Sequence, residues 1–470
     1  MSDIPISPDD VLEEGDFQRR RSDLLDTTRE LLAENDLPAL RLILNNQHPS
    51  DLADLLGQFS EEDQPRLFEL LATTLGASTL SELDAPALHS LFEHLDDRTI
   101  SRYVERMEPD DAADLLGELS EERRTGVIAF LAEQTTETVE ELLPHAEDTG
   151  GGIMTSRLVA LREDMTVEDA VNHIREWGHG DEVFYLYVVS ENHRLVGTVP
   201  LKRFVVASPG TKIRQITKPD PLSVRPDMDQ EEVAHIFADY NLLALPVVDD
   251  QGVLIGQITV DDIVDVIKEE ATEDFYEMAA ISSEEMEERS AFGVVKRRLP
   301  WLLVCLGGTF LSGAVIDLFS DSLSKLQGMV LFLPGIMAMG GNSGVQTSTV
   351  TIRNITLGSS VAFGNILRGI LRELRIASTM GILLGLLVAG VARLWTGDTV
   401  IGGCVGLAMC SAIVVAAALG ALIPVVFYRF DIDPAVASGP LITTMNDALS
   451  LIIYFGVSIV LLHFFRPGFL

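Results

Sequence analysis

The chain has 470 residues, of which 71 are Asp or Glu and 34 are Lys or Arg, so its formal net charge is −37 at pH 7. Seven of the acidic residues follow Ala291, which leaves 64 acidic and 23 basic residues before it. This surface excludes nucleic acid as a partner, because phosphate binding requires clustered Lys and Arg. It favours divalent cations as ligands; acidity that serves only solubility or life at high salt is the alternative.

The first part of the chain contains an internal repeat. The segment HPSDLADLLGQFSEE (48–62) recurs as EPDDAADLLGELSEE (108–122), and apolar residues follow helical spacing around both copies. We therefore predict an N-terminal tail over 1–25 and an α-helical, superhelical repeat domain over 26–147. Asp110 and Asp114 share one helix face at i and i+4, where they repel each other unless a cation binds; a solvated acidic pair is the alternative.

A second duplication occupies 148–267. Each copy predicts a lead-in strand, a helix, an apolar strand (YLYVV or ALPVV), a turn, a glycine-containing strand and a closing helix. The pattern resembles the CBS-domain pair, an α/β unit in which a Thr-x-x-Asp after the last strand often takes part in nucleotide binding. Thr259 and Asp262 match it in the second copy, whereas Pro200 and Arg203 stand there in the first. The resemblance leaves ATP or another adenine nucleotide open as a ligand.

A connecting helix is predicted over 268–295, directly before the membrane part. Its start and the residues before it carry carboxylates on nearly one helix face, namely Asp262, Asp265, Glu269 or Glu270, Glu273 and Asp274. Charge runs usually form a solvated face, but a helix with charge-dependent packing is well placed here to gate a pore.

The region 296–470 predicts five membrane-spanning helices. Its apolar runs reach the length of about 20 residues that a bilayer requires, at roughly 299–319, 327–350, 374–395, 400–428 and 436–463. Lys and Arg concentrate at one side of these segments, which places the soluble region in the cytoplasm and the C-terminus outside. We expect a multi-pass protein of a bacterial-type plasma or inner membrane.

Polar residues interrupt the second of these segments. LPGIMAMGGNSGVQTSTVTIRN (333–354) contains the helix-breaking Pro334, four glycines and Asn342. We expect broken backbone here, which is tolerated at membrane depth only where it lines a cavity or is buried in protein. Tight helix packing through small residues is the alternative.

The last segment carries one carboxylate, Asp447, near its middle. A charge at the bilayer centre costs about 2.5 to 3.5 kcal/mol, so we expect this one to be used. Thr443, Ser450 and Tyr454 recur near it at helical spacing. Together with Asn342, these oxygen donors suit a hard cation such as Mg²⁺, Ca²⁺ or Mn²⁺. The alternative is a structural carboxylate that hydrogen-bonds a neighbouring helix or stays protonated.

The chain resembles the MgtE magnesium transporters along essentially its whole length. The most specific pieces are GGNSGVQ (340–346), DPAVASGP (433–440) and TTMNDA (443–448), which occur in this order after the helical repeats and the paired CBS modules. The resemblance implies a homodimeric Mg²⁺ channel with its pore between the protomers. It also implies that Mg²⁺, as substrate and regulator, binds the soluble domains and closes the pore.

The resemblance also assigns individual residues. It makes Asp447 the pore carboxylate and Asp433 a nearby metal-associated one. It assigns modulatory ligands to Asp110, Asp114, Asp229, Glu231, Asp262, Asp265, Glu270, Glu273 and Asp274, and a backbone carbonyl to Gly152. Asn241 stands where an acidic ligand is expected, and Gly439 where a side-chain amide can occur.

No enzyme is expected, because the sequence has no His-Glu-x-x-His, no phosphate-binding loop and no Ser–His–Asp set that spacing supports. Two other functions remain open beside the channel. One is a carrier for Mg²⁺, Co²⁺ or Zn²⁺ that is coupled to another gradient. The other is a membrane-tethered CBS sensor that moves no ion, although such a sensor has no need of Asp447.

Overall fold

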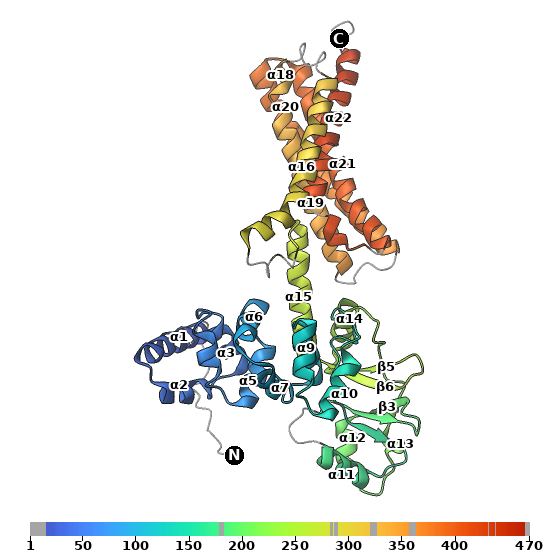
Figure 1. Cartoon of the computed structure of the whole chain (residues 1–470). Helices are drawn as coiled ribbons and strands as arrows, with labels where there is room; N and C mark the ends of the chain where they lie inside the picture. Colours follow the sequence, from blue (N-terminus) through green and yellow to red (C-terminus); the bar gives the residue numbers. More distant parts are fainter. Residues whose placement is uncertain are drawn as a thin grey trace. The chain divides into compact units, whose positions relative to one another are not determined.

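The computed structural model describes residues 16–177, 183–282, 285, 290–319, 327–356, 363–430, 432–437 and 439–465. The chain divides into two units, Met1–Ile267 and Lys268–Leu470 (Figure 1). The predicted tail overlaps the first helix, which begins at Asp16.

The first ten helices form the predicted repeat domain. Asp36, Asp84 and Asp96 begin three of them, since each side chain accepts a hydrogen bond from the backbone N–H three residues on. The helices are α1 Asp16–Glu34, α2 Leu37–Leu44, α3 Pro49–Leu56, α4 Gln64–Phe68, α5 Thr73–Ser81, α6 Ala85–His94, α7 Asp97–Val104, α8 Pro109–Gly117, α9 Glu121–Ile128 and α10 Glu133–Leu142.

The two copies of the repeat fold alike. Each gives a short helix, α3 or α8, with proline in its first turn, where the missing N–H costs nothing. The shared apolar positions are buried in both, as Leu55 and Leu56 in the first copy and Leu115 and Leu116 in the second. Burial of these leucines in one continuous core holds the successive helices together.

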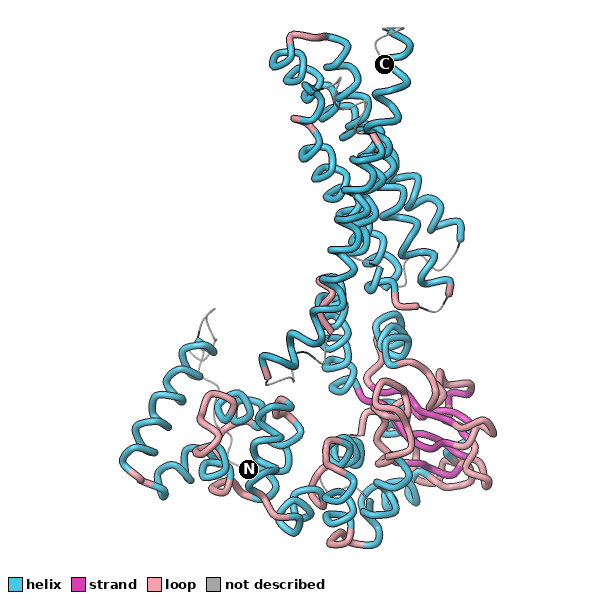
Figure 2. The backbone as a smooth tube through the Cα atoms, turned by 45° about the horizontal axis from the view of Figure 1, so that its top comes forward, coloured by secondary structure: helices cyan, strands magenta, loops and turns pink. Residues whose placement is uncertain are grey.

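The α/β part holds the predicted pair of modules, and Figure 2 shows the strands gathered there. One sheet has the order β1-β2-β3-β4, and β5 pairs with β6 in a second sheet. The modules exchange a strand partner, because Thr155 before β1 pairs with Gln257 of β6. The elements are β1 Ala160–Arg162, α11 Val167–Trp177, β2 Leu186–Val189, β3 Leu195–Val199, α12 Leu201–Val206, α13 Ile213–Ile216, β4 Lys218–Pro219, α14 Gln230–Tyr240, β5 Ala244–Val248 and β6 Leu254–Thr259.

A long helix, α15 Val260–Met278, follows β6 without a loop. The Thr259 hydroxyl donates a 2.5 Å hydrogen bond to the Asp262 carboxylate, which fixes the start of the helix. The connecting helix therefore begins inside the second module, eight residues before the predicted boundary at 268. Beyond it, the Glu285 carboxylate accepts a 2.6 Å hydrogen bond from Arg298 Nε in the first membrane helix.

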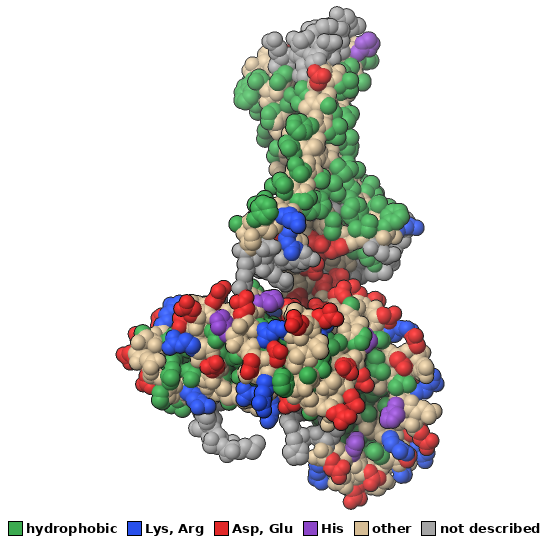
Figure 3. Space-filling view, viewed as in Figure 1, with side chains coloured by type: hydrophobic (Ala, Val, Ile, Leu, Met, Phe, Trp, Pro, Cys, Tyr) green, Lys and Arg blue, Asp and Glu red, His purple; other side chains and the backbone are tan. Residues whose placement is uncertain are grey.

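Five helical segments of the second unit, counted within its described residues, are long and apolar enough to cross a membrane. Figure 3 shows hydrophobic side chains over most of the visible face of this unit. The fold predicted from sequence, a helical domain, a CBS-like pair and five membrane helices, is confirmed. The elements are α16 Ala291–Leu318, α18 Gln327–Val330, α19 Leu333–Thr356, α20 Phe363–Thr396, α21 Thr399–Arg429, η3 Pro434–Ala437 and α22 Gly439–Phe465.

The expected break in the glycine-rich segment is wrong. Helix α19 runs without interruption from Leu333 to Thr356. Pro334 lies in its first turn, where the fixed φ of proline suits a helix and no N–H partner is lost. The glycines serve close packing instead, because a Cβ at Gly420 of α21 would collide with the carbonyl oxygen of Gly344 of α19.

Candidate cation pathway and acidic clusters

The predicted pore carboxylate lies on α22 where this helix packs against α19. Asp447 is half-buried, and Thr443, one turn earlier, is exposed. A Cβ added at Gly341 of α19 would lie 3.5 Å from Thr443 Cγ2 and 3.9 Å from Asp447 Oδ1. Within the described part of the chain, the Asp447 carboxylate accepts no hydrogen bond and forms no ion pair. The described residues thus offer Asp447 no hydrogen-bond partner on a neighbouring helix, and its role stays a prediction.

The other residues predicted for the pathway have different surroundings. Asn342 is exposed on α19, next to Gly341. Ser450 is only 2% exposed, and a Cβ added at Gly340 would collide with the Ser450 hydroxyl. Ser450 thus faces the helix bundle, whereas the side chains of Asn342 and Thr443 are exposed on its surface. Their part in the pathway stays a prediction.

One polar residue of this region was missed from the sequence. Asn446 is 1% exposed, and neither amide atom has a hydrogen-bond partner among the described residues. Its Nδ2 lies where a Cβ of Gly344 would be, so glycine is required opposite it. A charged residue such as Asp447 stands out in an apolar segment of the sequence, whereas an uncharged amide such as that of Asn446 is a weaker indication of a functional position.

An acidic cluster lies within the first unit, where α8 meets the start of α15. Asp110 is 7% exposed, and its Oδ1 has no partner among the described residues. Burial and the neighbouring Asp262 raise the pKa of Asp110 well above its usual range. Burial also raises the pKa of Asp262 to about 7 and that of Asp111 to about 6. These carboxylates repel one another, so a divalent cation there would relieve both repulsion and burial.

The first repeat shows how the same positions are neutralised without a metal. Asp51 and Asp54 correspond to Asp111 and Asp114 of the second repeat. Both pair with Arg21 of α1; Arg21 Nε lies 3.0 Å from Asp51 Oδ1. The sequence signal of the two repeats is nearly identical, yet an arginine covers the first pair and acidic residues of α15 approach the second.

A second acidic cluster lies within the second unit, between α15 and the turn before α22. Burial and Asp433 raise the pKa of Asp274 to about 6. Burial and a hydrogen bond with Asp433 raise the pKa of Glu277 to about 8. Asp433 Oδ1 also accepts a 2.7 Å hydrogen bond from the backbone N–H of Ala435. Glu277 was not among the predicted ligands, although it continues the spacing of Glu273 by one turn.

Other predicted modulatory residues have structural contacts of their own. Asp229 caps α14 by accepting a 2.8 Å hydrogen bond from the N–H of Glu231. Glu231 lies 3.8 Å from His235. Asn241 ends α14 in the left-handed conformation, with φ 51°, which asparagine tolerates well.

Gly152 lies in a tight turn of the first unit, where its N–H donates to the Thr149 carbonyl at 2.9 Å. Its assigned role, a free backbone carbonyl for a cation, stays a prediction. The remaining predicted ligands lie on the surfaces of α8 and α15, and they are Asp114, Asp265 and Glu273, which are exposed, and Glu270, which is half-buried.

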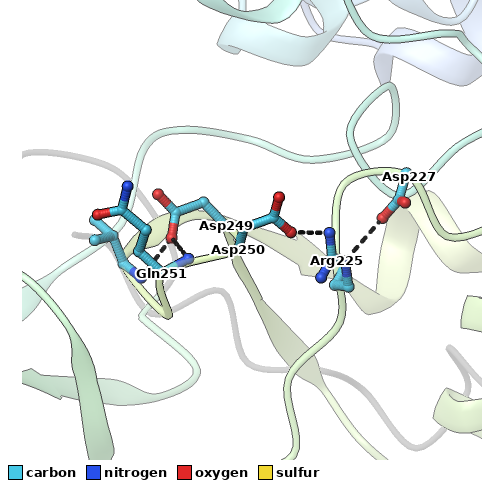
Figure 4. Close-up of polar contacts among 6 residues, drawn as sticks. Arg225, Asp227, Asp249, Asp250 and Gln251 are labelled. Carbon is cyan, nitrogen blue, oxygen red and sulfur yellow. Dashed lines mark hydrogen bonds and ion pairs between the residues drawn. The ribbon is translucent and has the colours of Figure 1, made fainter.

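Some acidic residues of the second module are committed to turns. Figure 4 shows Arg225 between Asp227 and Asp250, with Arg225 Nε 3.1 Å from Asp227 Oδ1. Asp249 Oδ1 accepts a 2.8 Å hydrogen bond from the backbone N–H of Gln251. These carboxylates stabilise the loops around β5 through the ion pairs and hydrogen bonds that they form there.

No three His, Cys, Asp or Glu side chains converge on a ready metal site within the described residues. The two clusters nevertheless offer carboxylate oxygens, the donors that Mg²⁺ prefers, and Mg²⁺ needs only one or two of them because it keeps several waters. The unpartnered Oδ1 of Asp110 fits such an ion.

Comparisons with known proteins agree with this architecture. Family models match the divalent cation transporter domain of MgtE over 333–457, the MgtE intracellular N domain over 47–148, and the CBS domain over 150–210 and 213–269. The chain is 31% identical to the magnesium transporter MgtE of Bacillus subtilis, over 92% of this chain and 96% of the relative. It is 32% identical to that of Thermus thermophilus, over 93% and 98%.

Solved structures add a likeness to the soluble part. A crystal structure of the cytosolic domain of the Mg²⁺ channel MgtE in complex with ATP is 36% identical, covers 52% of this chain and 99% of that chain, and has a TM-score of 0.49. The sequence relatives and family models carry the assignment. The chain belongs to the MgtE family of magnesium transporters.

Proposed function

We propose that this chain conducts Mg²⁺ through a pore that two copies form at their shared axis, with the soluble unit in the cytoplasm and the C-terminus outside. The observation that carries the proposal is Asp447, a half-buried carboxylate without a described partner, beside the exposed Thr443. An unpaired carboxylate at membrane depth is costly unless an ion uses it. Two such carboxylates at the axis would neutralise a dication.

The position of the axis leads to a cross-linking prediction. In a chain whose three cysteines are replaced, Thr443→Cys is expected to form a disulfide-linked dimer in membranes under mild oxidation. The matched control is Met445→Cys, because Met445 is 43% exposed at nearly the same depth but on the opposite side of α22. Cross-linking of Met445→Cys without cross-linking of Thr443→Cys would contradict the proposed axis.

We propose further that Mg²⁺ on the soluble side closes this pore. When Mg²⁺ is scarce, the carboxylates of the two acidic clusters repel each other and favour separation of the elements that carry them. When Mg²⁺ is plentiful, the ion bridges these carboxylates and favours the closed state. The shift equals the difference in affinity of Mg²⁺ for the two states, so several weak sites give a steep response.

Replacing Asp262 and Asp265 together by alanine is expected to leave conduction intact and to weaken inhibition by cytoplasmic Mg²⁺. Loss of both ligands together is expected to remove about 1.4 kcal/mol of differential binding, which moves the inhibition midpoint roughly tenfold upward. Patch recordings across a cytoplasmic Mg²⁺ titration measure this midpoint.

The control for that experiment removes the same charge elsewhere. Glu121→Ala with Glu122→Ala takes two exposed carboxylates from α9 and should leave the midpoint where it is. If both double variants shift it equally, the net charge of the soluble unit controls the pore and the Asp110–Asp262 cluster does not.

A further inference from the structure

Three arginines line one face of α20 near its beginning. Arg368, Arg372 and Arg375 follow one another at i, i+4 and i+7, within about 60° around the helix axis, and all three are exposed. Exposed apolar side chains flank them, with Leu371 45% and Ile376 41% exposed. The helix thus presents a basic stripe between two apolar edges.

The length of α20 sets the depth of this stripe. Its 34 residues span about 51 Å, whereas the hydrocarbon core of a bilayer is about 30 Å thick. Arg393 and the exposed Trp395 mark the far end, where aromatic side chains commonly lie at the interface. Counting about 20 residues back from Thr396 places the hydrocarbon boundary near Ala377. At 1.5 Å per residue, Arg375 and Arg372 then lie about 3 and 8 Å beyond this boundary, at headgroup depth, and Arg368 lies about 14 Å beyond it, where a long side chain can reach back toward the headgroups.

The opposite face of the same stretch is covered by protein. Ile366, Gly369, Ile370 and Glu373 line a small cavity together with residues of α19 and with Val425 of α21. The carboxylate of this stretch, Glu373, therefore points to the side of α20 away from the arginine stripe. The stripe itself lies on the exposed face of α20.

We propose that Arg368, Arg372 and Arg375 form a binding site for the phosphate headgroups of anionic phospholipids. Guanidinium groups bind phosphate oxygens in pairs of hydrogen bonds, and each basic side chain near the membrane surface adds attraction to anionic headgroups. Leu371 and Ile376 provide apolar contact for its acyl chains. Arg353 and Arg429, both exposed at the ends of α19 and α21, add positive charge at the same end of the unit.

The site is tested on the full chain in detergent with equal amounts of phosphatidylglycerol and phosphatidylcholine, counting retained lipids by native mass spectrometry. The wild type is expected to retain phosphatidylglycerol preferentially. In the triple variant Arg368→Gln, Arg372→Gln, Arg375→Gln, the ratio of retained phosphatidylglycerol to retained phosphatidylcholine should fall roughly tenfold. The corresponding triple lysine variant should keep most of it. Arg393→Gln, an exposed arginine at the other end of α20, should keep all of it.

Three results would overturn the proposal. The first is a triple glutamine variant that retains phosphatidylglycerol like the wild type. The second is a loss of preference in Arg393→Gln as large as that of the triple change. The third is complete displacement of the lipid by excess inorganic phosphate, which would identify a site for free phosphate. Gel filtration checks that each variant is folded. If the triple glutamine variant does not fold, the comparison of Arg372→Gln with Arg393→Gln decides, since only the former should lower the preference.

Discussion

Replacing Asp447 by alanine is expected to abolish Mg²⁺ uptake into proteoliposomes while leaving the folded protein as stable as before or more stable. The carboxylate has no described hydrogen-bond partner, and holding it at membrane depth costs about 3 kcal/mol. Its removal therefore takes away the proposed ligand of the ion and a destabilising charge at once. A Mg²⁺-sensitive dye inside the vesicles measures uptake, and thermal unfolding in detergent measures stability.

The opposite signs of these two effects separate function from structure. If Asp447 were only a structural residue, the alanine variant would lose stability, and the protein that remains folded would conduct like the wild type; the pathway would then have to be sought around Asn342. Asp447→Asn keeps the size of the side chain and should also fail to transport. Ser458→Ala removes another buried polar group of α22, 1% exposed, and should transport like the wild type.

Replacing Gly420 by alanine is expected to destabilise the membrane unit by about 3 kcal/mol, which corresponds to a Tm roughly 10 °C lower. The new Cβ would collide with the carbonyl oxygen of Gly344 and lie 3.2 Å from its Cα. Because these obstacles are backbone atoms of α19, the helices must move apart. That movement also displaces Asn446, which packs on the other side of Gly344.

The matched control is Gly403→Ala on the same helix. A Cβ at Gly403 meets no atom of the described residues within 4 Å, so the substitution should gain up to about 1 kcal/mol of helix propensity. Thermal unfolding of both variants in the same detergent gives the comparison. Equal Tm values for Gly420→Ala and Gly403→Ala would mean that α19 and α21 do not approach each other as closely as described.

The sequence predicted features that depend on local pattern. An apolar run of membrane length predicts a spanning helix independently of the rest of the fold, because such a helix makes all of its backbone hydrogen bonds within the segment. The five spans were found in this way, although α20 begins at Phe363, well before the predicted start at 374. Arginines at headgroup depth hid that first part of the helix, since hydropathy alone ends a span at the first charges.

Two features of the structure could not be predicted from the local sequence pattern. Pro334 predicts a break within the glycine-rich segment, yet the interruption lies just before it, at the turn 331–332 between α18 and α19, and Pro334 itself lies in the first turn of α19. Glu277 was missed because its partner Asp433 lies more than 150 residues away in the chain. Spacing along one helix does not show which distant carboxylate approaches it.

By itself, the sequence determined the domain order and the membrane segments, and it singled out Asp447 for a proposed role, because a lone carboxylate in an apolar run is costly in any fold. Tertiary structure decided which acidic residues meet. Asp51 and Asp111 occupy equivalent places in two nearly identical repeats, but the first pairs with Arg21 and the second lies in a cluster with Asp110 and Asp262. Electrostatic character depends on neighbours in space, and packing alone supplies those neighbours.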